Sequence, residues 1–252
     1  MQVTTTENIN NSFFSGVYKE IWRQMIPDGL TKAENEWIIQ ETNLRPGDRL
    51  IDLMCGYGRH ALAIARKGIH VTAVDNLKEY VEEIKSTAQK ENLPVECLEE
   101  DVLKLGLDDE YHAAICMGNS ICFFDAGDVL KVFLEVSKHL KTGGKFIICS
   151  WRLNEIVANG FKEKTWSYVG DIKFLAESKF LLSPSRIEMQ NIFIDPNGKT
   201  EEKTAIDYIY SLNETEQMLN LAGFIMKEVW SIPGKKKFNL GEPRSYIVAE
   251  RK

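Results

Sequence analysis

Acidic side chains and glycines recur where apolar segments end in the first half of the chain. An apolar segment that contains Asp52 runs into Gly56 and Gly58, and Asp75 closes the next apolar segment, 19 residues after Gly56. Glycines allow a sharp turn and a close approach of the backbone to a ligand. A carboxylate at the end of a second strand can accept two hydrogen bonds from ribose hydroxyls. The pattern indicates a strand–turn–helix unit that binds a nucleoside.

A third carboxylate extends this series. Asp101 comes directly after the next strand-like segment, and Val102 follows it. The Asp101 side chain can accept from the exocyclic amine of adenine, while the backbone N–H of Val102 reaches a ring nitrogen. Ligand positions at three successive strand ends are expected to meet at one edge of a parallel sheet, where the strand order reverses.

Two classes of cofactor use a glycine turn of this kind. A dinucleotide requires Gly-x-Gly-x-x-Gly, so that its pyrophosphate lies at the helix N-terminus. Here Arg59-His60-Ala61 follow the second glycine, and the bulky Arg59 and His60 crowd the phosphate path. A nicotinamide-dependent oxidoreductase is thus disfavoured, while a non-catalytic cofactor-binding module stays open. Arg59 is expected either to neutralise a carboxylate of cofactor or substrate or to be solvated.

Strand-like and helix-like segments alternate around these residues. Strands are expected at 49–54, 69–75, 94–98, 111–117 and 145–151. Helices are expected at 13–25, 31–42, 59–67, 77–92 and 128–140. Near-continuous apolar strands predict a parallel sheet covered by helices on both faces. The helix at 31–42 is expected to open with a capping box, Thr31-Lys32-Ala33-Glu34, and Thr142-Gly143-Gly144 to close the helix at 128–140.

The pattern changes after residue 160. Three strands are expected at 172–182, 187–195 and 200–212, with a turn at 195–198 between the last two. A helix at 214–221 and strands near 224–232 and 245–251 follow. The expected organisation is an N-terminal helical lid at 1–44, a cofactor-binding core at 45–160 and 213–252, and an antiparallel insertion at 161–212 that covers the substrate.

These motifs together resemble those of class I S-adenosylmethionine-dependent methyltransferases. Residues 52–60 (DLMCGYGRH) resemble the L-D-L-x-C-G-x-G-R-H form of the first motif, and residues 71–75 (VTAVD) resemble V-T-G-V-D. Residues 140–144 (LKTGG) are similar to L-K-P-G-G, and residues 221–224 (LAGF) to L-x-x-A-G-F. The chain is similar within this class to small-molecule enzymes with an antiparallel insertion, such as glycine and sugar-amine N-methyltransferases.

The resemblance implies an α/β fold, a doubly wound, Rossmann-like sheet of seven strands whose last strand is antiparallel. It implies S-adenosyl-L-methionine as cofactor and S-adenosyl-L-homocysteine as product. The residues expected to contact the cofactor are Tyr18, Asp52, Cys55, Gly56, Gly58, Arg59, Asp75, Asn76, Asp101, Val102, Met117 and Asn119. Two departures are Met54, where many members have glycine, and His112, where Asp commonly opens the fourth strand.

Residues for the acceptor are expected after the fourth and fifth strands and in the insertion. Trp151, Arg152, Tyr168 and Arg244 are expected to bind the substrate, and Asn119 and Tyr168 are the catalytic candidates. Asn119 either holds the cofactor's methionine amine, orients the acceptor or only shapes a turn. Alternatively, the aromatic residues fill the core of the insertion, and Arg244 is a solvated side chain in a loop.

Methyl transfer from a sulfonium is an in-line displacement, in which the protein positions the reactants and excludes water. A neutral amine needs no strong base, so the lack of an obvious general base is compatible with an amine acceptor. We expect a small-molecule nitrogen acceptor, with a small-molecule O-methyltransferase as the alternative. Methylation of RNA or protein is disfavoured, because the [D/N]-P-P-[Y/F] box is missing and the net charge of −6 repels phosphate backbones.

Composition adds few further constraints. The five cysteines form no Cys-x-x-Cys pair and the four histidines show no metal-ligand spacing, so neither a disulfide framework nor a metal site is expected. The longest stretch without charged residues has 14 residues, and no basic segment precedes an apolar one at the N-terminus. We therefore expect a cytoplasmic protein without a membrane span. The oligomeric state stays open.

Overall fold

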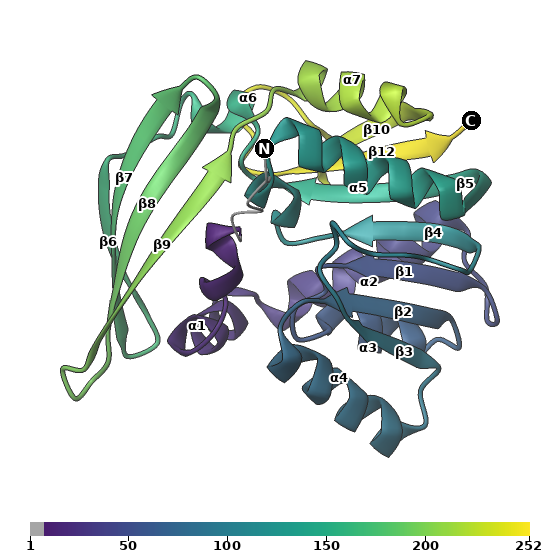
Figure 1. Ribbon diagram of the computed structural model, residues 1–252, viewed down its shortest axis with the longest axis horizontal. Coiled ribbons are helices and arrows are strands. Elements are labelled where there is room, and N and C mark those ends of the chain that lie inside the picture. Colours follow the sequence, from purple (N-terminus) through teal and green to yellow (C-terminus); the bar gives the residue numbers. More distant parts are fainter. Residues whose placement is uncertain (1–7) are drawn as a thin grey trace, which may run out of the picture.

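The computed structural model describes residues 8–252 and contains one large sheet and one small sheet (Figure 1). The large sheet has the order β11-β10-β12-β5-β4-β1-β2-β3. Its strands are β1 (Arg49–Leu53), β2 (His70–Asp75), β3 (Val95–Glu99), β4 (Tyr111–Cys116), β5 (Leu140–Ser150), β10 (Phe224–Ile232), β11 (Lys236–Lys237) and β12 (Ser245–Arg251). β12 pairs antiparallel with both β5 and β10, while β1 to β5 pair in parallel. The doubly wound sheet with an antiparallel last strand is confirmed, and the two-residue β11 adds an eighth strand.

Helices cover both faces of this sheet because its strands are apolar on both sides. Leu50 packs in one buried cluster with side chains of α2, α3 and α4, and the next residue, Ile51, packs in another with side chains of α5 and α7. Successive residues of a strand point to opposite faces. The helices are α2 (Asp28–Thr42), α3 (Arg59–Ala65), α4 (Lys78–Glu91), α5 (Ala126–His139) and α7 (Leu212–Leu221).

The insertion forms the second, antiparallel sheet in the order β6-β7-β8-β9. Its strands are β6 (Lys164–Val169), β7 (Ile172–Leu182), β8 (Ser185–Ile194) and β9 (Thr200–Tyr208), preceded by α6 (Asn154–Val157). Three strands are expected from the sequence, and β6 is the fourth. The turn at 195–198 is present, since the Gly198 N–H donates to the Asp195 carbonyl at 3.0 Å.

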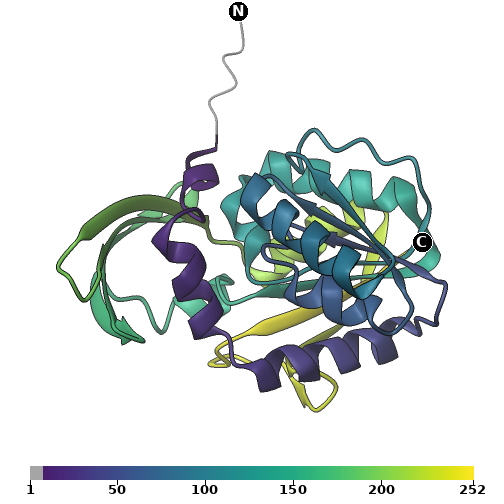
Figure 2. The same cartoon turned by 90° about the horizontal axis from the view of Figure 1, so that it is seen from below.

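The N-terminal helices differ from the sequence-based expectation. A 3-10 turn, η1 (Ile9–Ser12), precedes α1 (Val17–Met25), because Gly16 has a φ of +67° and interrupts the expected helix at 13–25. α2 begins at Asp28 and not at a capping box, so that Thr31 and Glu34 lie inside it. Figure 2 shows α1 between the small sheet and the large sheet. Residues 1–7 of the expected lid lie outside the described residues.

The segment after α5 also departs from expectation. α5 ends at His139, and Thr142-Gly143-Gly144 lie within β5 instead of closing the helix. Within residues 8–252, no helix is both long enough and apolar enough to span a bilayer. The same described residues contain no cluster of His, Cys, Asp and Glu side chains arranged to hold a metal ion.

Candidate active site

A cavity of about 540 Å³ opens at the carboxyl ends of the parallel strands. Its walls come from the turns that follow β1 to β5, from η1 and α1, and from β7, β8 and β9 of the insertion. The volume is typical of a site for a small molecule or cofactor, and the place is the edge at which doubly wound sheets bind ligands.

The turn between β1 and α3 holds three residues in the left-handed backbone region. Met54, Gly56 and Gly58 have φ values of +54°, +56° and +77°. The value at Met54 explains why glycine is common there in the resembling family, since left-handed backbone costs a side-chain-bearing residue about 1 kcal/mol. Gly58 is absent from the cavity wall, and a Cβ there would lie 2.6 Å from Cγ1 of Ile84. Gly58 therefore serves the packing of the turn against α4, and the expected cofactor contact is not supported.

Asp75 links the turn after β1 to the turn after β2. Its Oδ2 accepts the Gly56 N–H at 2.8 Å, and its Oδ1 accepts the Leu77 N–H at 3.0 Å. Burial raises the pKa of this carboxyl, and the backbone hydrogen bonds oppose that rise. A carboxylate oxygen can accept more than one hydrogen bond, so both oxygens can still receive ribose hydroxyls. Asp75 lines the cavity.

Other residues of the core that are expected to contact the cofactor also reach the cavity. Asn76, Asp101 and Val102 line it together with Cys55 and Met117. The Oδ1 of Asp101 accepts the Leu103 N–H at 3.0 Å, which fixes the side chain at the end of β3.

Asp52 carries an unpartnered carboxylate oxygen. Its side chain is buried at the cavity wall, and Oδ2 has no hydrogen-bond partner among residues 8–252. Burial raises the pKa of Asp52 to about 7, Arg59 lowers it and Asp75 raises it further. A buried, unpaired carboxylate is costly unless a donor or cation binds to it. An ammonium group, such as that of a methionine moiety, fits this oxygen.

Arg59 is buried and not solvated. Its Nη1 donates to Oε2 of Glu34 at 2.5 Å and to Oγ1 of Thr31 at 3.1 Å, and its side chain is 9% exposed. Thr31 and Glu34, expected as a cap, instead hold this arginine at the cavity. His60 is packed beside it, and burial lowers its pKa well below the usual value, so that it is neutral.

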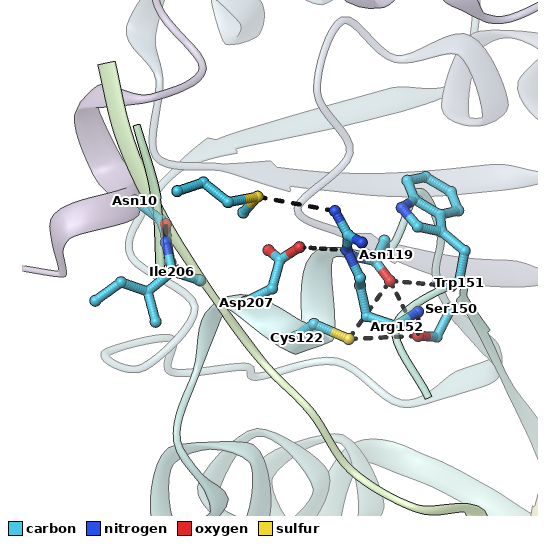
Figure 3. A network of polar contacts seen from close by, with 9 residues as sticks. Asn10, Asn119, Cys122, Ser150, Trp151, Arg152, Ile206 and Asp207 are labelled. Carbon is cyan, nitrogen blue, oxygen red and sulfur yellow. Dashed lines mark hydrogen bonds and ion pairs between the residues drawn. The ribbon is translucent and has the colours of Figure 1, made fainter. Parts of the chain in front are cut away.

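Asn119 holds the ends of β4 and β5 together (Figure 3). Its φ is +73°, and its Oδ1 accepts the Trp151 N–H and the Ser150 hydroxyl, both at 3.0 Å. The Cys122 thiol donates to the same oxygen at 3.4 Å. This oxygen is therefore occupied, which supports the turn-shaping role over the binding of an amine. Asn119 also lines the cavity.

An ion pair between a partly exposed arginine and a buried carboxylate lies on the side of the cavity formed by the insertion. Nε of Arg152 donates to Oδ2 of Asp207 at 2.6 Å, and Nη2 of Arg152 contacts the Met189 sulfur at 3.8 Å (Figure 3). Burial raises the pKa of Asp207, and Arg152 opposes that rise. Within the described residues, the hydrogen bond of the Asp207 carboxylate is made by Oδ2, and Oδ1 has no hydrogen-bond partner. The sequence reasoning missed Asp207, because strand alternation in β9 gives no signal of a site.

The other expected acceptor residues divide into two groups. Trp151 and Arg244 line the cavity, and the Arg244 guanidinium lies 5.1 Å from the centre of the Trp151 ring, which supports the expected place of Arg244 at the site. Tyr168 does not line the cavity, and it is 63% exposed beside Trp166. Both lie on β6, the edge strand of the small sheet that pairs with β7, and their rings contact each other. Tyr168 is thus removed from the catalytic and substrate-binding candidates, and neither aromatic fills the core of the insertion.

Tyr18 reaches the cavity from α1. Its ring packs against Phe13 at 4.3 Å and Phe193 at 6.0 Å between centroids. Burial and the nearby Asp207 raise the pKa of its hydroxyl, so that it stays protonated and can donate a hydrogen bond into the cavity.

The sequence of the core matches a family described as a methyltransferase domain, over residues 50–144. A putative methyltransferase of Bacillus subtilis, YqeM, is 26% identical over 86% of this chain and 87% of its own length. A glycine/sarcosine N-methyltransferase of Aphanothece halophytica is 25% identical over 68% of this chain and 66% of its own length. A ubiquinone biosynthesis O-methyltransferase of Rickettsia typhi is 31% identical over 45% and 46%, respectively.

The fold is also found among solved structures. An S-adenosylmethionine-dependent methyltransferase from Clostridium acetobutylicum superposes with a TM-score of 0.79, at 20% identity over 93% of this chain and 96% of that one. The glycine turn, the three strand-end carboxylates and the unpaired Asp52 oxygen fit the nucleoside and methionine parts of the same cofactor. Residues 50–144 therefore form a methyltransferase domain, and the chain is an S-adenosylmethionine-dependent methyltransferase with S-adenosyl-L-methionine as its cofactor.

Proposed function

We propose that the protein transfers the methyl group to an amine nitrogen of a small molecule. The observation that carries this proposal is the carboxylate of Asp207, buried in the cavity wall with one oxygen free of hydrogen bonds. An amine must lose a proton before its lone pair can attack, and a carboxylate with a raised pKa is a suitable proton acceptor. The glycine/sarcosine N-methyltransferase relative supports the same class of acceptor.

The residues of this chain divide between the two ends of the cavity. On the core side, Asp75 would hold the ribose, Asp101 and Val102 the adenine, and Asp52 the ammonium of the methionine part. The bound cofactor supplies an electrophilic methyl group on a positively charged sulfonium. On the insertion side, Arg152 fixes one oxygen of Asp207, so that the other faces the acceptor.

Closure of the site follows from the proposed three-part organisation. The lid (residues 1–44) contributes Tyr18 and other aromatic side chains, the core binds the cofactor, and the insertion (residues 161–212) contributes Asp207. Exclusion of water strengthens the interaction of Asp207 with a cationic amine. Arg152 would bind an anionic group of the acceptor where it carries one.

An assay with methyl-labelled S-adenosylmethionine tests this proposal. We expect label on primary and secondary amines, including glycine and sarcosine, but not on phenols. Asp207→Asn, which keeps the shape of the side chain, should lower kcat/KM by about 10² or more, because the proton acceptor is lost. Label that appears only on hydroxyl groups would show the proposal to be wrong.

A small-molecule O-methyltransferase is the second candidate, supported by the relative from Rickettsia typhi. A hydroxyl nucleophile needs a stronger base than an amine does. In that case the phenols in the same assay should carry the label, and kcat should rise with pH beyond the range in which Asp207 ionises.

A further inference from the structure

Glu34 is a fully buried carboxylate at the centre of a polar cluster drawn from three parts of the chain. Its Oε2 accepts from Nη1 of Arg59 at 2.5 Å. Its Oε1 accepts the hydroxyl of Tyr246 at 2.7 Å and lies 3.5 Å from Nη1 of Arg244. The Tyr246 hydroxyl also accepts a hydrogen bond from Arg244 at 3.2 Å. These contacts fix α2, α3 and β12 to one another, together with the loop that precedes β12.

Both arginines of the cluster line the cavity, whereas Glu34 itself does not. Arg59 belongs to the turn that opens α3 and acts electrostatically on Asp52. Arg244 lies over the Trp151 ring on another part of the wall. Each oxygen of one carboxylate thus faces a different cationic side chain of the site.

The charges of this cluster do not balance. Two guanidinium groups face one carboxylate, and the neighbouring His60 is neutral because burial lowers its pKa. Arginine stays ionised in proteins. The two guanidinium groups share this one carboxylate and both reach the cavity, so an anionic ligand group there can receive charge-assisted hydrogen bonds from them.

We propose that Glu34 is a positioning residue, which holds Arg59 and Arg244 in the orientation that binds the carboxylate of the cofactor's methionine part. This inference rests on the cofactor and not on the identity of the acceptor. Glu34 fixes the direction of the two guanidinium groups, while Asp52 receives the ammonium at the neighbouring oxygen. Together they would recognise a zwitterionic amino acid moiety.

Two ligands that differ only in this moiety provide the test. S-adenosyl-L-homocysteine carries the amino acid group, and 5′-methylthioadenosine has the same nucleoside and thioether without it. By calorimetry, Glu34→Gln should raise the Kd for S-adenosylhomocysteine about tenfold or more. The reason is that Arg59 and Arg244 lose the orientation in which they donate charge-assisted hydrogen bonds to the carboxylate of the ligand. The Kd for methylthioadenosine should change less than about twofold. Glu91→Gln, which breaks an exposed pair with Arg66, should change neither Kd.

Equal weakening of both ligands would show that Glu34 only supports the fold, and an unchanged Kd for S-adenosylhomocysteine would also overturn the proposal. If Glu34→Gln does not fold, two other variants decide. Tyr246→Phe removes one donor to Glu34. The double variant Glu34→Gln with Arg59→Met removes one charge of each sign from the core. Each should weaken S-adenosylhomocysteine selectively, and loss of selectivity would contradict the proposal.

Discussion

Asp52 and Asp75 are both buried at strand ends, but their oxygens differ in what they bind. Both oxygens of Asp75 accept backbone N–H groups, whereas Oδ2 of Asp52 has no partner in the described part of the chain. Asp75 is therefore fixed before any ligand arrives, and Asp52 keeps free capacity for a cation. Burial raises the pKa of Asp52 to about 7, while at Asp75 three backbone hydrogen bonds oppose the effect of burial.

This raised pKa predicts proton release on ligand binding. At pH 6 the carboxyl of Asp52 is mostly protonated in the free protein, and an ammonium group that binds to it favours the ionised form. We expect S-adenosylhomocysteine to release about one proton per site at pH 6 and almost none at pH 8.5. Calorimetry in buffers of different ionisation enthalpy measures this number. Asp52→Asn should abolish the difference, and a difference that persists in this variant would refute the assignment.

The same shift affects the stability of the free protein. The pKa of Asp52 in the folded chain lies above its ordinary value of 3.8, so the folded state binds more protons than the unfolded state between these two pKa values. The contribution of this group to the free energy of unfolding is therefore fully present below about pH 4 and is lost as the pH rises through 7. In urea titrations, Asp52→Asn should flatten this pH dependence.

Gly58 should tolerate no side chain. Gly58→Ala should lower the free energy of unfolding by roughly 2–4 kcal/mol, because the new Cβ would overlap Ile84 and the backbone is left-handed. Gly56→Ala is the matched control, since it shares the left-handed backbone but has no atom within 4 Å of the new Cβ. Urea denaturation without ligand measures both. Equal losses in the two variants would mean that contact with Ile84 does not matter.

At the scale of residues, the sequence predicts those whose spacing along the chain reflects local structure. Asp75 and Asp101 follow strands directly, so their place at the sheet edge could be inferred. Glu34 and Asp207 could not, because their partners Arg59 and Arg152 come from other segments of the chain. Tyr168 is misplaced by the sequence-based prediction, since its segment gives no sign of which side chains meet the cavity.

At the scale of elements, a clasp attaches the N-terminal segment to the insertion. The side chain of Asn10 in η1 accepts the Ile206 N–H at 2.8 Å and donates to the Ile206 carbonyl at 2.9 Å, as a neighbouring strand would (Figure 3). It also donates to the carbonyl of Phe123 at 3.2 Å. Nζ of Lys203 donates to the carbonyls of Ser12 and Ser15. The start of the lid therefore depends on β9.

Asn10→Ala should release this clasp. The backbone groups of Ile206 would lose buried partners, and we expect a loss of roughly 1–3 kcal/mol in the free energy of unfolding. Hydrogen exchange should become faster in residues 8–25 and in β9. Asn11→Ala, whose side chain has only an exposed contact with Asn76, is the control and should have little effect. Unchanged exchange in Asn10→Ala would contradict the clasp.

The elements of the core were more predictable than those of the lid and insertion. β10 and β12 have the expected bounds, because their apolar runs are bounded by turn residues. β6 is not expected from the sequence, because its Trp166 and Tyr168 alternate with polar residues over only six positions and remain exposed. The start of α2 was misassigned, because Thr31 and Glu34 match a cap in sequence but serve Arg59 in the fold.

At the scale of the whole molecule, three parts of the chain enclose one cavity. The core supplies the strand ends at which we propose that the nucleoside binds, and the sequence motifs indicate this part of the cavity wall. The lid and insertion supply the other walls, and their contacts join residues nearly 200 positions apart, as between Asn10 and Ile206. Such contacts leave no local pattern, which is why the cofactor could be inferred from the sequence and the acceptor could not.

Calorimetric titration with S-adenosylhomocysteine tests the central claim most directly, with Asp75→Ala as the variant. We predict one site per chain in the wild-type protein. The Kd should rise about a hundredfold in Asp75→Ala, because two hydrogen bonds from ribose to a charged group are lost. NAD should not compete. Binding that is unchanged in Asp75→Ala, or displaced by NAD, would contradict the account.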